Sequence, residues 1–160
     1  AVEATRYHPA GNRSVGGSLH CLNFGVPASE YYAEASNEIF VAVQTEHIEA
    51  VENAEEICAV EGVDAIFVGP NDLLQSMEKT PGMESDDMEF VEAMDHLRET
   101  ALKHGVAPGL HTLLPEQLRR RLDEGWTFLA LGSDAALMLQ GAKSSLEEAG
   151  ITGDGDSARY

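Results

Sequence analysis

One order of segments repeats along most of the chain: an apolar run, a polar turn, a stretch with helical spacing, and then a glycine. Strands that alternate with helices are typical of parallel pairing, because each helix carries the chain back across the sheet. The runs are apolar on both faces, as a buried parallel sheet requires. The sequence therefore predicts an α/β fold with about four parallel strands, at residues 39–44, 63–68, 106–111 and 126–131.

The segments between these runs place apolar residues at steps of three and four, which indicates amphipathic helices. Pro115 fits the first turn of a helix, where its missing N–H group is not needed. The third strand is expected to be weak, because Pro108 and Gly109 interrupt it. We expect helices over residues 48–58, from about Ser85 to Gly105, from Pro115 to Gly125, and from a capping Asp134 through Leu146.

The first and last parts of the chain do not continue this repeat. Residues 1–38 are predicted to be a Gly-rich loop and a short helix near 28–38 that lead into four β/α units over residues 39–151. Residues 152–160 are rich in Gly, Asp and Ser, and we predict a disordered tail. A closed (β/α)₈ barrel needs eight strands and about 250 residues. Periodicity alone leaves two architectures open, a small open sheet or the second half of a barrel.

The charge is strongly acidic, with 28 Asp and Glu against 10 Lys and Arg and a net charge of −18. Nucleic acids and anionic membranes bind to basic faces, so neither is expected as a partner. The acid excess fits a surface adapted to high salt, which screens self-repulsion. An ordinary acidic cytosolic protein is the alternative interpretation.

The sequence has no signal peptide and no long uncharged apolar run, so neither secretion nor membrane insertion is expected. Its two cysteines, Cys21 and Cys58, are far apart in the sequence and near no pair of histidines. This pattern suits a reduced cytoplasm, the expected location, and it argues against a zinc site.

Two acidic residues follow consecutive predicted strands: Glu46 comes after 39–44, and Asp72 comes after 63–68. In parallel α/β folds, chemistry collects at the carboxyl ends of the strands. Neighbouring strands lie about 5 Å apart, so both carboxylates are expected to face one small volume. Magnesium or manganese would accept two carboxylates and keep waters that a substrate can displace. Alternatively, Glu46 caps the following helix and Asp72 is a turn residue.

Four segments carry a resemblance to a known family: RYHPAGNRSVG, VAVQTE, AVEGVDAIFVGPNDL and GWTFLALGSDAALM. In this order they resemble the C-terminal half of the HpcH/HpaI aldolases, the metal-dependent class II pyruvate aldolases, over almost the whole chain. The resemblance implies that the chain is the C-terminal half of a (β/α)₈ TIM barrel. It also implies a homo-oligomer in which the final helix is exchanged with, or packed against, a neighbouring subunit.

The resemblance implies cleavage of a 4-hydroxy-2-oxo acid into pyruvate and an aldehyde, through a pyruvate enolate stabilised by Mg²⁺, Mn²⁺ or Co²⁺. Carried over by position, Glu46 and Asp72 are the metal ligands and Gln44 lines the pyruvate site. The backbone N–H groups of Asn71 and Asp72 would hold the pyruvate carboxylate. Oxaloacetate decarboxylases and citrate-lyase-like relatives use the same metal enolate and are alternatives, as is a non-catalytic subunit that binds metal or pyruvate.

The family's catalytic His and the Arg that steadies the oxyanion lie in the first half of the barrel, and no residue here matches them. We therefore expect this chain alone to be inactive, as a truncated gene product or as one half of a split barrel completed by an N-terminal half. His47 either starts a helix or supports the site. His111 follows the third strand at the catalytic mouth, where contact with the aldehyde portion is one interpretation.

Overall fold

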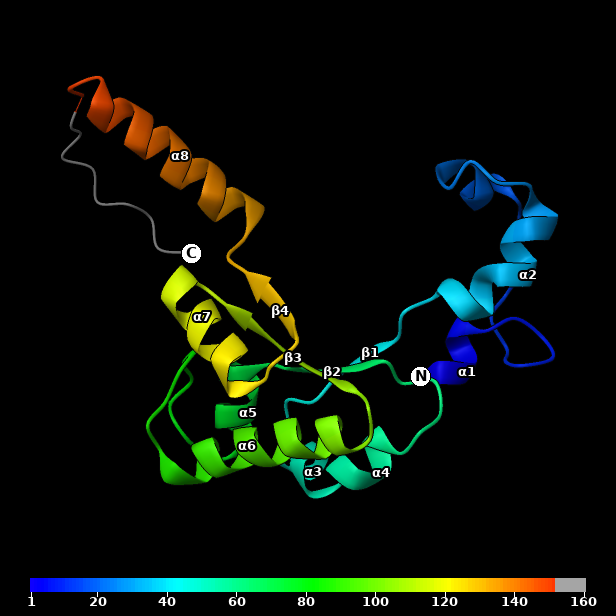
Figure 1. The fold of residues 1–160 in the computed structure, drawn as a ribbon, viewed down its shortest axis with the longest axis horizontal. Coiled ribbons are helices and arrows are strands. Elements are labelled where there is room, and N and C mark those ends of the chain that lie inside the picture. Colours follow the sequence, from blue (N-terminus) through cyan, green and yellow to red (C-terminus); the bar gives the residue numbers. More distant parts are fainter. Residues whose placement is uncertain (152–160) are drawn as a thin grey trace.

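The computed structural model describes residues 1–151, which form a four-stranded sheet in the order β1-β2-β3-β4 (Figure 1). Its strands are β1 (Ala42–Gln44), β2 (Ala65–Val68), β3 (Ala107–Thr112) and β4 (Phe128–Leu131). Every neighbouring pair is parallel. The carboxyl ends of all the strands therefore lie at one edge of the sheet, and the predicted α/β fold is confirmed. The tail predicted at residues 152–160 lies outside the described residues.

Helices connect successive strands: α3 (Ile48–Glu52), α4 (Ala54–Cys58), α5 (Pro70–Ser76), α6 (Met88–Lys103) and α7 (Pro115–Glu124). The last helix of the described residues, α8 (Asp134–Glu148), follows β4. The side chain of Asp87 caps α6, because it accepts hydrogen bonds from the backbone N–H groups of Glu89 and Phe90. Pro115 opens α7, and Gly125 ends it with a φ of 99°, a conformation that favours glycine. These boundaries agree with the sequence pattern.

Two local predictions were wrong, and one short helix was missed. The helix expected over 48–58 is interrupted at Asn53, which ends α3 and precedes α4. The short helix α5 was not predicted, because its seven residues follow Gly69 as part of what looks like a turn. Ser133, rather than Asp134, caps α8: its hydroxyl accepts a 3.2 Å hydrogen bond from the backbone N–H of Ala136.

Strand β3 was expected to be weak, and it is instead the longest strand, pairing with both β2 and β4. The carbonyl of Pro108 accepts a 3.0 Å hydrogen bond from the N–H of Thr127, so the proline still takes part in pairing. Gly109 is required by close approach, because a Cβ there would lie 2.6 Å from the Phe128 carbonyl oxygen and 2.9 Å from that of Ile66. Pro108 and Gly109 are therefore both compatible with a central strand, although their low strand propensity predicts the opposite.

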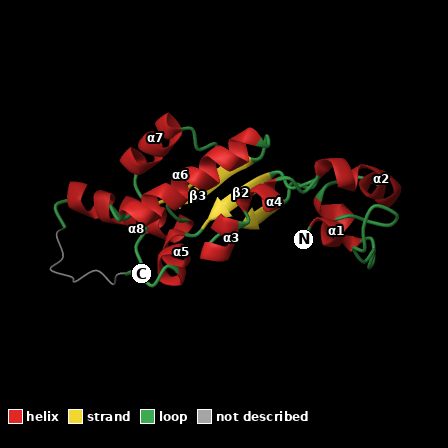
Figure 2. Ribbon diagram, turned by 90° about the horizontal axis from the view of Figure 1, so that it is seen from below, coloured by secondary structure: helices red, strands yellow, loops and turns green. Residues whose placement is uncertain are grey.

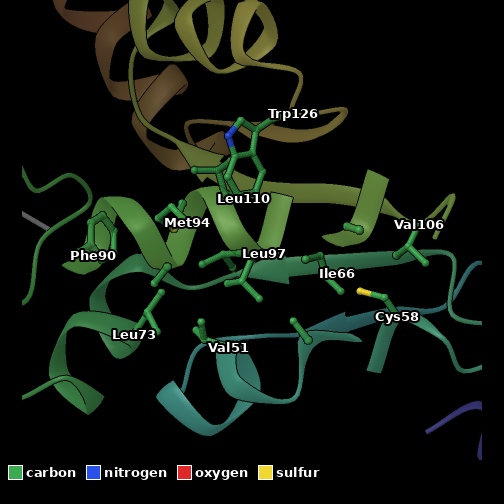
Figure 3. Packing of buried hydrophobic residues seen from close by; sticks show 14 of the residues in the cluster. Val51, Cys58, Ile66, Leu73, Phe90, Met94, Leu97, Val106, Leu110 and Trp126 are labelled. Carbon is green, nitrogen blue, oxygen red and sulfur yellow. The ribbon is translucent and has the colours of Figure 1, made fainter. Parts of the chain in front are cut away.

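The hydrophobic core lies between the sheet and the helices α3 to α6, which run along one face of it (Figures 1 and 3). Ile66 and Leu110 point from the strands into this core, where they meet Leu97 of α6. Trp126, just before β4, is 1% exposed and belongs to the same cluster. The core thus fixes the strands whose ends carry the site.

The opposite face of the sheet is less covered. Phe128 contacts Phe40 and Phe67, with ring centroids 5.2 Å and 5.7 Å apart, respectively. Phe40 is 55% exposed and Phe128 is 37% exposed. This is the face that would line the interior if the sheet were part of a barrel.

The ends of the described chain lie away from the sheet. Residues 1–38 form α1 (Val2–Thr5), the 3₁₀ helix η1 (Leu19–Asn23) and α2 (Ala28–Glu38), which is the expected short helix. These elements lie at one end of the molecule and α8 at the other (Figure 2). Within α8, all of which the structure describes, no residue is buried. None of the helices in residues 1–151 combines the length and apolarity that crossing a membrane requires.

Candidate metal and substrate site

A cavity of about 190 Å³ lies at the carboxyl edge of the strands. Residues from distant parts of the sequence line it: Gln44 ends β1 and Glu46 follows it, Asp72 lies on α5, and His111 lies on β3. Parallel pairing explains this meeting, since Gln44 faces Phe67 in the register and both strands end at the same edge. The structure therefore brings together the two acidic residues that the sequence singled out.

Glu46 is held in place from two sides. The Nε2 atom of Gln44 donates a 2.6 Å hydrogen bond to Oε2 of Glu46. The same carboxylate lies directly over Gly69, where an added Cβ would collide with Oε2. Gln44 thus orients the carboxylate, and the missing side chain of Gly69 makes room for it.

Asp72 and Asn71 lie in the first turn of α5, which begins at Pro70. The first helical hydrogen bond of this segment runs from the N–H of Leu73 to the carbonyl of Gly69, at 2.9 Å. The N–H groups of Asn71 and Asp72 precede it, so no carbonyl of the helix can accept from them. The side-chain amide of Asn71 donates to the sulfur of Met83 at 3.2 Å.

The alternative role predicted for Glu46 is wrong, because His47 caps α3. Nδ1 of His47 accepts a 3.2 Å hydrogen bond from the N–H of Glu49. This places His47 at a helix start, one of the two roles considered for it. Asp72 is a residue of α5 rather than of an irregular turn.

The donor set is compatible with a hard divalent cation that keeps open positions. Within residues 1–151, no group of three or more His, Cys, Asp or Glu side chains gathers in a way that could hold a metal. One or two carboxylates are, however, the usual protein contribution to a Mg²⁺ site, where waters and substrate oxygens supply the remaining ligands. The carboxylate of Glu46 fills the space that a side chain at position 69 would occupy, so the fold holds one of the two candidate ligands in a defined place.

Met83 and His111 line the cavity, and sequence reasoning missed the first and left the second open. Met83 belongs to the irregular segment before α6, whose path no periodicity describes. The sequence placed His111 near the carboxyl end of the third strand. It did not determine on which face of the sheet the side chain lies, and therefore whether it reaches the cavity.

A larger cavity of about 450 Å³ lies along α2 and is lined only by residues between Phe24 and Ile39. Its polar side chains are three glutamates and Tyr31, all from the single helix α2, without a converging histidine or amide. The smaller cavity is the better candidate site, since chemically different groups from several elements meet there.

Comparison with known proteins gives consistent results. The family described as HpcH/HpaI aldolase/citrate lyase matches residues 1–141. A 5-keto-4-deoxy-D-glucarate aldolase of Escherichia coli O6:H1 is 37% identical over 137 residues, covering 86% of this chain and 52% of the relative. A hydroxypyruvate/pyruvate aldolase of Cupriavidus necator is 38% identical over 144 residues, covering 89% of this chain and 52% of the relative.

Among solved structures, an HpcH/HpaI aldolase/citrate lyase family protein from Burkholderia cenocepacia J2315 superposes with a TM-score of 0.79 and 28% identity. The superposition covers 92% of this chain and 58% of that one. The chain therefore spans about half the length of the curated relatives it matches.

Proposed function

Since the chain belongs to the HpcH/HpaI aldolase/citrate lyase family, we propose that it forms the metal- and pyruvate-binding half of an aldolase active site. The reaction would be cleavage of a 4-hydroxy-2-oxo acid into pyruvate and an aldehyde. One observation carries the proposal: Gln44, Glu46 and Asp72 line a single cavity at the carboxyl ends of parallel strands. The two named relatives, both aldolases, support the reaction class.

In this proposal Glu46 and Asp72 hold a divalent cation, with Mg²⁺, Mn²⁺ and Co²⁺ as the candidates. A bound cation would supply Lewis-acid stabilisation of the negative charge that cleavage places on the keto oxygen of pyruvate. Gln44 keeps the carboxylate of Glu46 in one orientation through its 2.6 Å hydrogen bond. A neutral donor does this without adding charge to the site.

The pyruvate carboxylate needs hydrogen-bond donors that do not compete for the cation. Asn71 and Asp72 both line the cavity, and their backbone N–H groups, in the first turn of α5, have no helical acceptor. We propose that these two amides orient the carboxylate of pyruvate. The side-chain amide of Asn71 contacts Met83, another residue of the cavity lining.

Proton transfer needs a base, and the resemblance places that base and the stabilising Arg in the half of the barrel that this chain does not match. We propose that a polypeptide carrying that half completes the site over the open face around Phe40 and Phe128. Exposed Leu137, Met138 and Leu139 of α8 are where we expect packing against a neighbouring subunit. The purified chain is expected to bind metal and pyruvate without turnover.

A titration of the purified chain with Mn²⁺, followed by water-proton relaxation, tests the metal site. We expect one Mn²⁺ per chain, a relaxation change when pyruvate is added, and loss of both in Glu46→Gln and Asp72→Asn. Glu56→Gln and Asp86→Asn are matched controls, because these exposed acids lie outside the cavity. Binding that survives both site substitutions would refute the proposal.

A second measurement separates binding from catalysis. Exchange of the pyruvate methyl protons in D₂O reports proton removal and needs a base. We expect no exchange from the chain alone, although pyruvate binds. Rapid exchange would show that the base lies in this chain, and it would contradict the proposal that the other half of the barrel supplies it.

A further inference from the structure

His111 is a residue of the cavity wall whose chemistry the proposed function does not use. It lies on β3 opposite Ala130 of β4, at the edge where the strands end. Its side chain lines the same cavity as Gln44, Glu46 and Asp72 and is partly buried. It is thus placed to contact a molecule bound there.

One ring nitrogen of His111 is already engaged. Nε2 lies 2.7 Å from the carbonyl oxygen of Gly132. A carbonyl can only accept a hydrogen bond, so Nε2 must carry the proton and donate. In the neutral ring, Nδ1 is therefore an acceptor, since the hydrogen bond of one nitrogen fixes the state of the other.

The carbonyl that fixes this tautomer is itself held by the ends of β3 and β4. The N–H of Gly132 donates a 2.7 Å hydrogen bond to the carbonyl of Thr112, and the Thr112 hydroxyl donates to the carbonyl of Ala130 at 2.9 Å. Gly132 has a φ of 61°, a conformation that favours glycine. The ring is therefore anchored on a rigid turn, as a group that selects a ligand requires.

Among residues 1–151, Nδ1 of His111 has no hydrogen-bond partner, and the ring takes part in no ion pair. Nδ1 is also not among the buried side-chain atoms that lack a hydrogen-bond partner in the described residues. Nδ1 is therefore open to the contents of the cavity or to water. The chemical group that complements a neutral imidazole acceptor is a hydroxyl donor.

We infer that His111 is a specificity residue that favours hydroxylated aldehydes, by accepting a hydrogen bond at Nδ1 from a hydroxyl of the aldehyde portion. The inference rests on the proposed function, which places pyruvate beside Glu46 and Asp72 in the same cavity. A polar group that a ligand leaves unpaired lowers the affinity for that ligand. A 2-hydroxyaldehyde should thus bind better than an aldehyde of the same length without hydroxyl groups.

The test uses the ¹⁵N-labelled full chain with Mg²⁺ and saturating pyruvate, titrated with glyceraldehyde or with propanal. We expect the free chain to show His111 protonated at Nε2. Glyceraldehyde should move the Nδ1 resonance and bind roughly 3- to 10-fold more tightly than propanal, the effect of one net hydrogen bond. Propanal should leave Nδ1 unchanged.

Two variants complete the test. In His111→Leu the preference for glyceraldehyde should disappear while pyruvate affinity stays within about twofold, since no pyruvate contact is removed. In His111→Asn, whose side-chain oxygen can replace Nδ1 as an acceptor, part of the preference should remain. A preference that persists in His111→Leu, or a ring protonated at Nδ1, would overturn the inference. Absence of metal-dependent pyruvate binding, seen before any aldehyde is added, would instead overturn the proposed function beneath it.

Discussion

The side chain of Gln44 donates a 2.6 Å hydrogen bond to the Glu46 carboxylate, two residues further along the chain. The bond joins a neutral donor to a proposed metal ligand, so it restricts the orientation of that ligand. Groups that orient a metal ligand in this way fix its direction and raise its basicity, so they contribute to the metal affinity of a site. This relationship leads to the first prediction.

Replacing Gln44 with Leu should weaken Mn²⁺ binding by about 10- to 100-fold, the usual effect of losing a group that orients a metal ligand. Glu46 itself remains, so binding should be reduced rather than abolished. Titration followed by water-proton relaxation measures the change. Gln140→Leu on exposed α8 is the control; equal affinities in the two variants would show that the hydrogen bond has no role in metal binding.

Gly69→Ala should also weaken Mn²⁺ binding, by about tenfold or more. The φ of Gly69 is −97° and its ψ is 96°, so alanine can adopt the backbone conformation. The effect should come from the new Cβ, which would push Oε2 of Glu46 out of place. Gly17→Ala adds a Cβ where nothing lies within 4 Å, and it should leave Mn²⁺ affinity unchanged; an unaltered affinity in Gly69→Ala would contradict the assignment of Glu46.

Gly109→Ala should lower the free energy of unfolding by about 1–3 kcal/mol, the usual cost of overpacking. Its Cβ would meet backbone oxygens of β4 and β2, which cannot rotate away as a side chain can. Urea denaturation provides the measurement. Gly141→Ala in α8 adds a Cβ with nothing within 4 Å and should stabilise by roughly 0.5–1 kcal/mol, as expected for a helix interior. A neutral Gly109→Ala variant would mean that β3 adjusts to the added carbon.

Strand β3 also shows which features of the fold the sequence pattern did not predict. The sequence located all four strands, because a parallel sheet with apolar residues on both faces leaves long apolar runs. It underestimated β3, since Pro108 and Gly109 are unfavourable locally and are accommodated only by contacts with strands distant in the sequence. It also missed α5, which is too short to show a helical repeat.

For the site, the parallel order of the strands singled out Glu46 and Asp72, because it determines which loops meet, and the family resemblance added Gln44. The orienting bond between Gln44 and Glu46 and the space over Gly69 depend on side-chain geometry, which spacing does not determine. Met83 enters from an irregular segment, and only the folded chain shows it beside Asn71. Topology was thus predictable, while the details that orient the ligands were not.

The chain should become more stable when KCl is raised from 0.1 M to 2 M. Its 28 acidic and 10 basic residues produce self-repulsion that favours the expanded state, and salt shortens the range of that repulsion from about 10 Å to about 3 Å or less. Chloride is preferred to sulfate, which would also strengthen apolar burial. The midpoint of thermal unfolding should rise with KCl; a constant or falling midpoint would exclude adaptation of this surface to high salt.

Glu55 of α4 accepts hydrogen bonds from Lys103 at 2.6 Å and from His104 at 2.7 Å, at the end of α6. These bonds, that of Lys103 foremost, lower the pKa of Glu55 from 4.5 to about 2. A carboxyl group whose pKa is lower in the folded state stabilises the fold above its unfolded pKa, and this contribution disappears as the pH falls through the folded pKa. Glu55 should therefore stabilise the fold fully above about pH 4.5 and not below about pH 2.

The difference in urea midpoint between the parent chain and Glu55→Gln measures this contribution as a function of pH. We expect the parent to be more stable at pH 6, with a difference that shrinks as the pH falls from 4.5 towards 2. The neighbouring Glu56 has no ion-pair partner among residues 1–151, so Glu56→Gln should show no such dependence. Because the hydrogen bond of Lys103 is the largest single cause of the lowered pKa, Lys103→Met should reduce the same pH-dependent difference. A difference that stays constant over this range would mean that the bonds to Lys103 and His104 do not persist in solution.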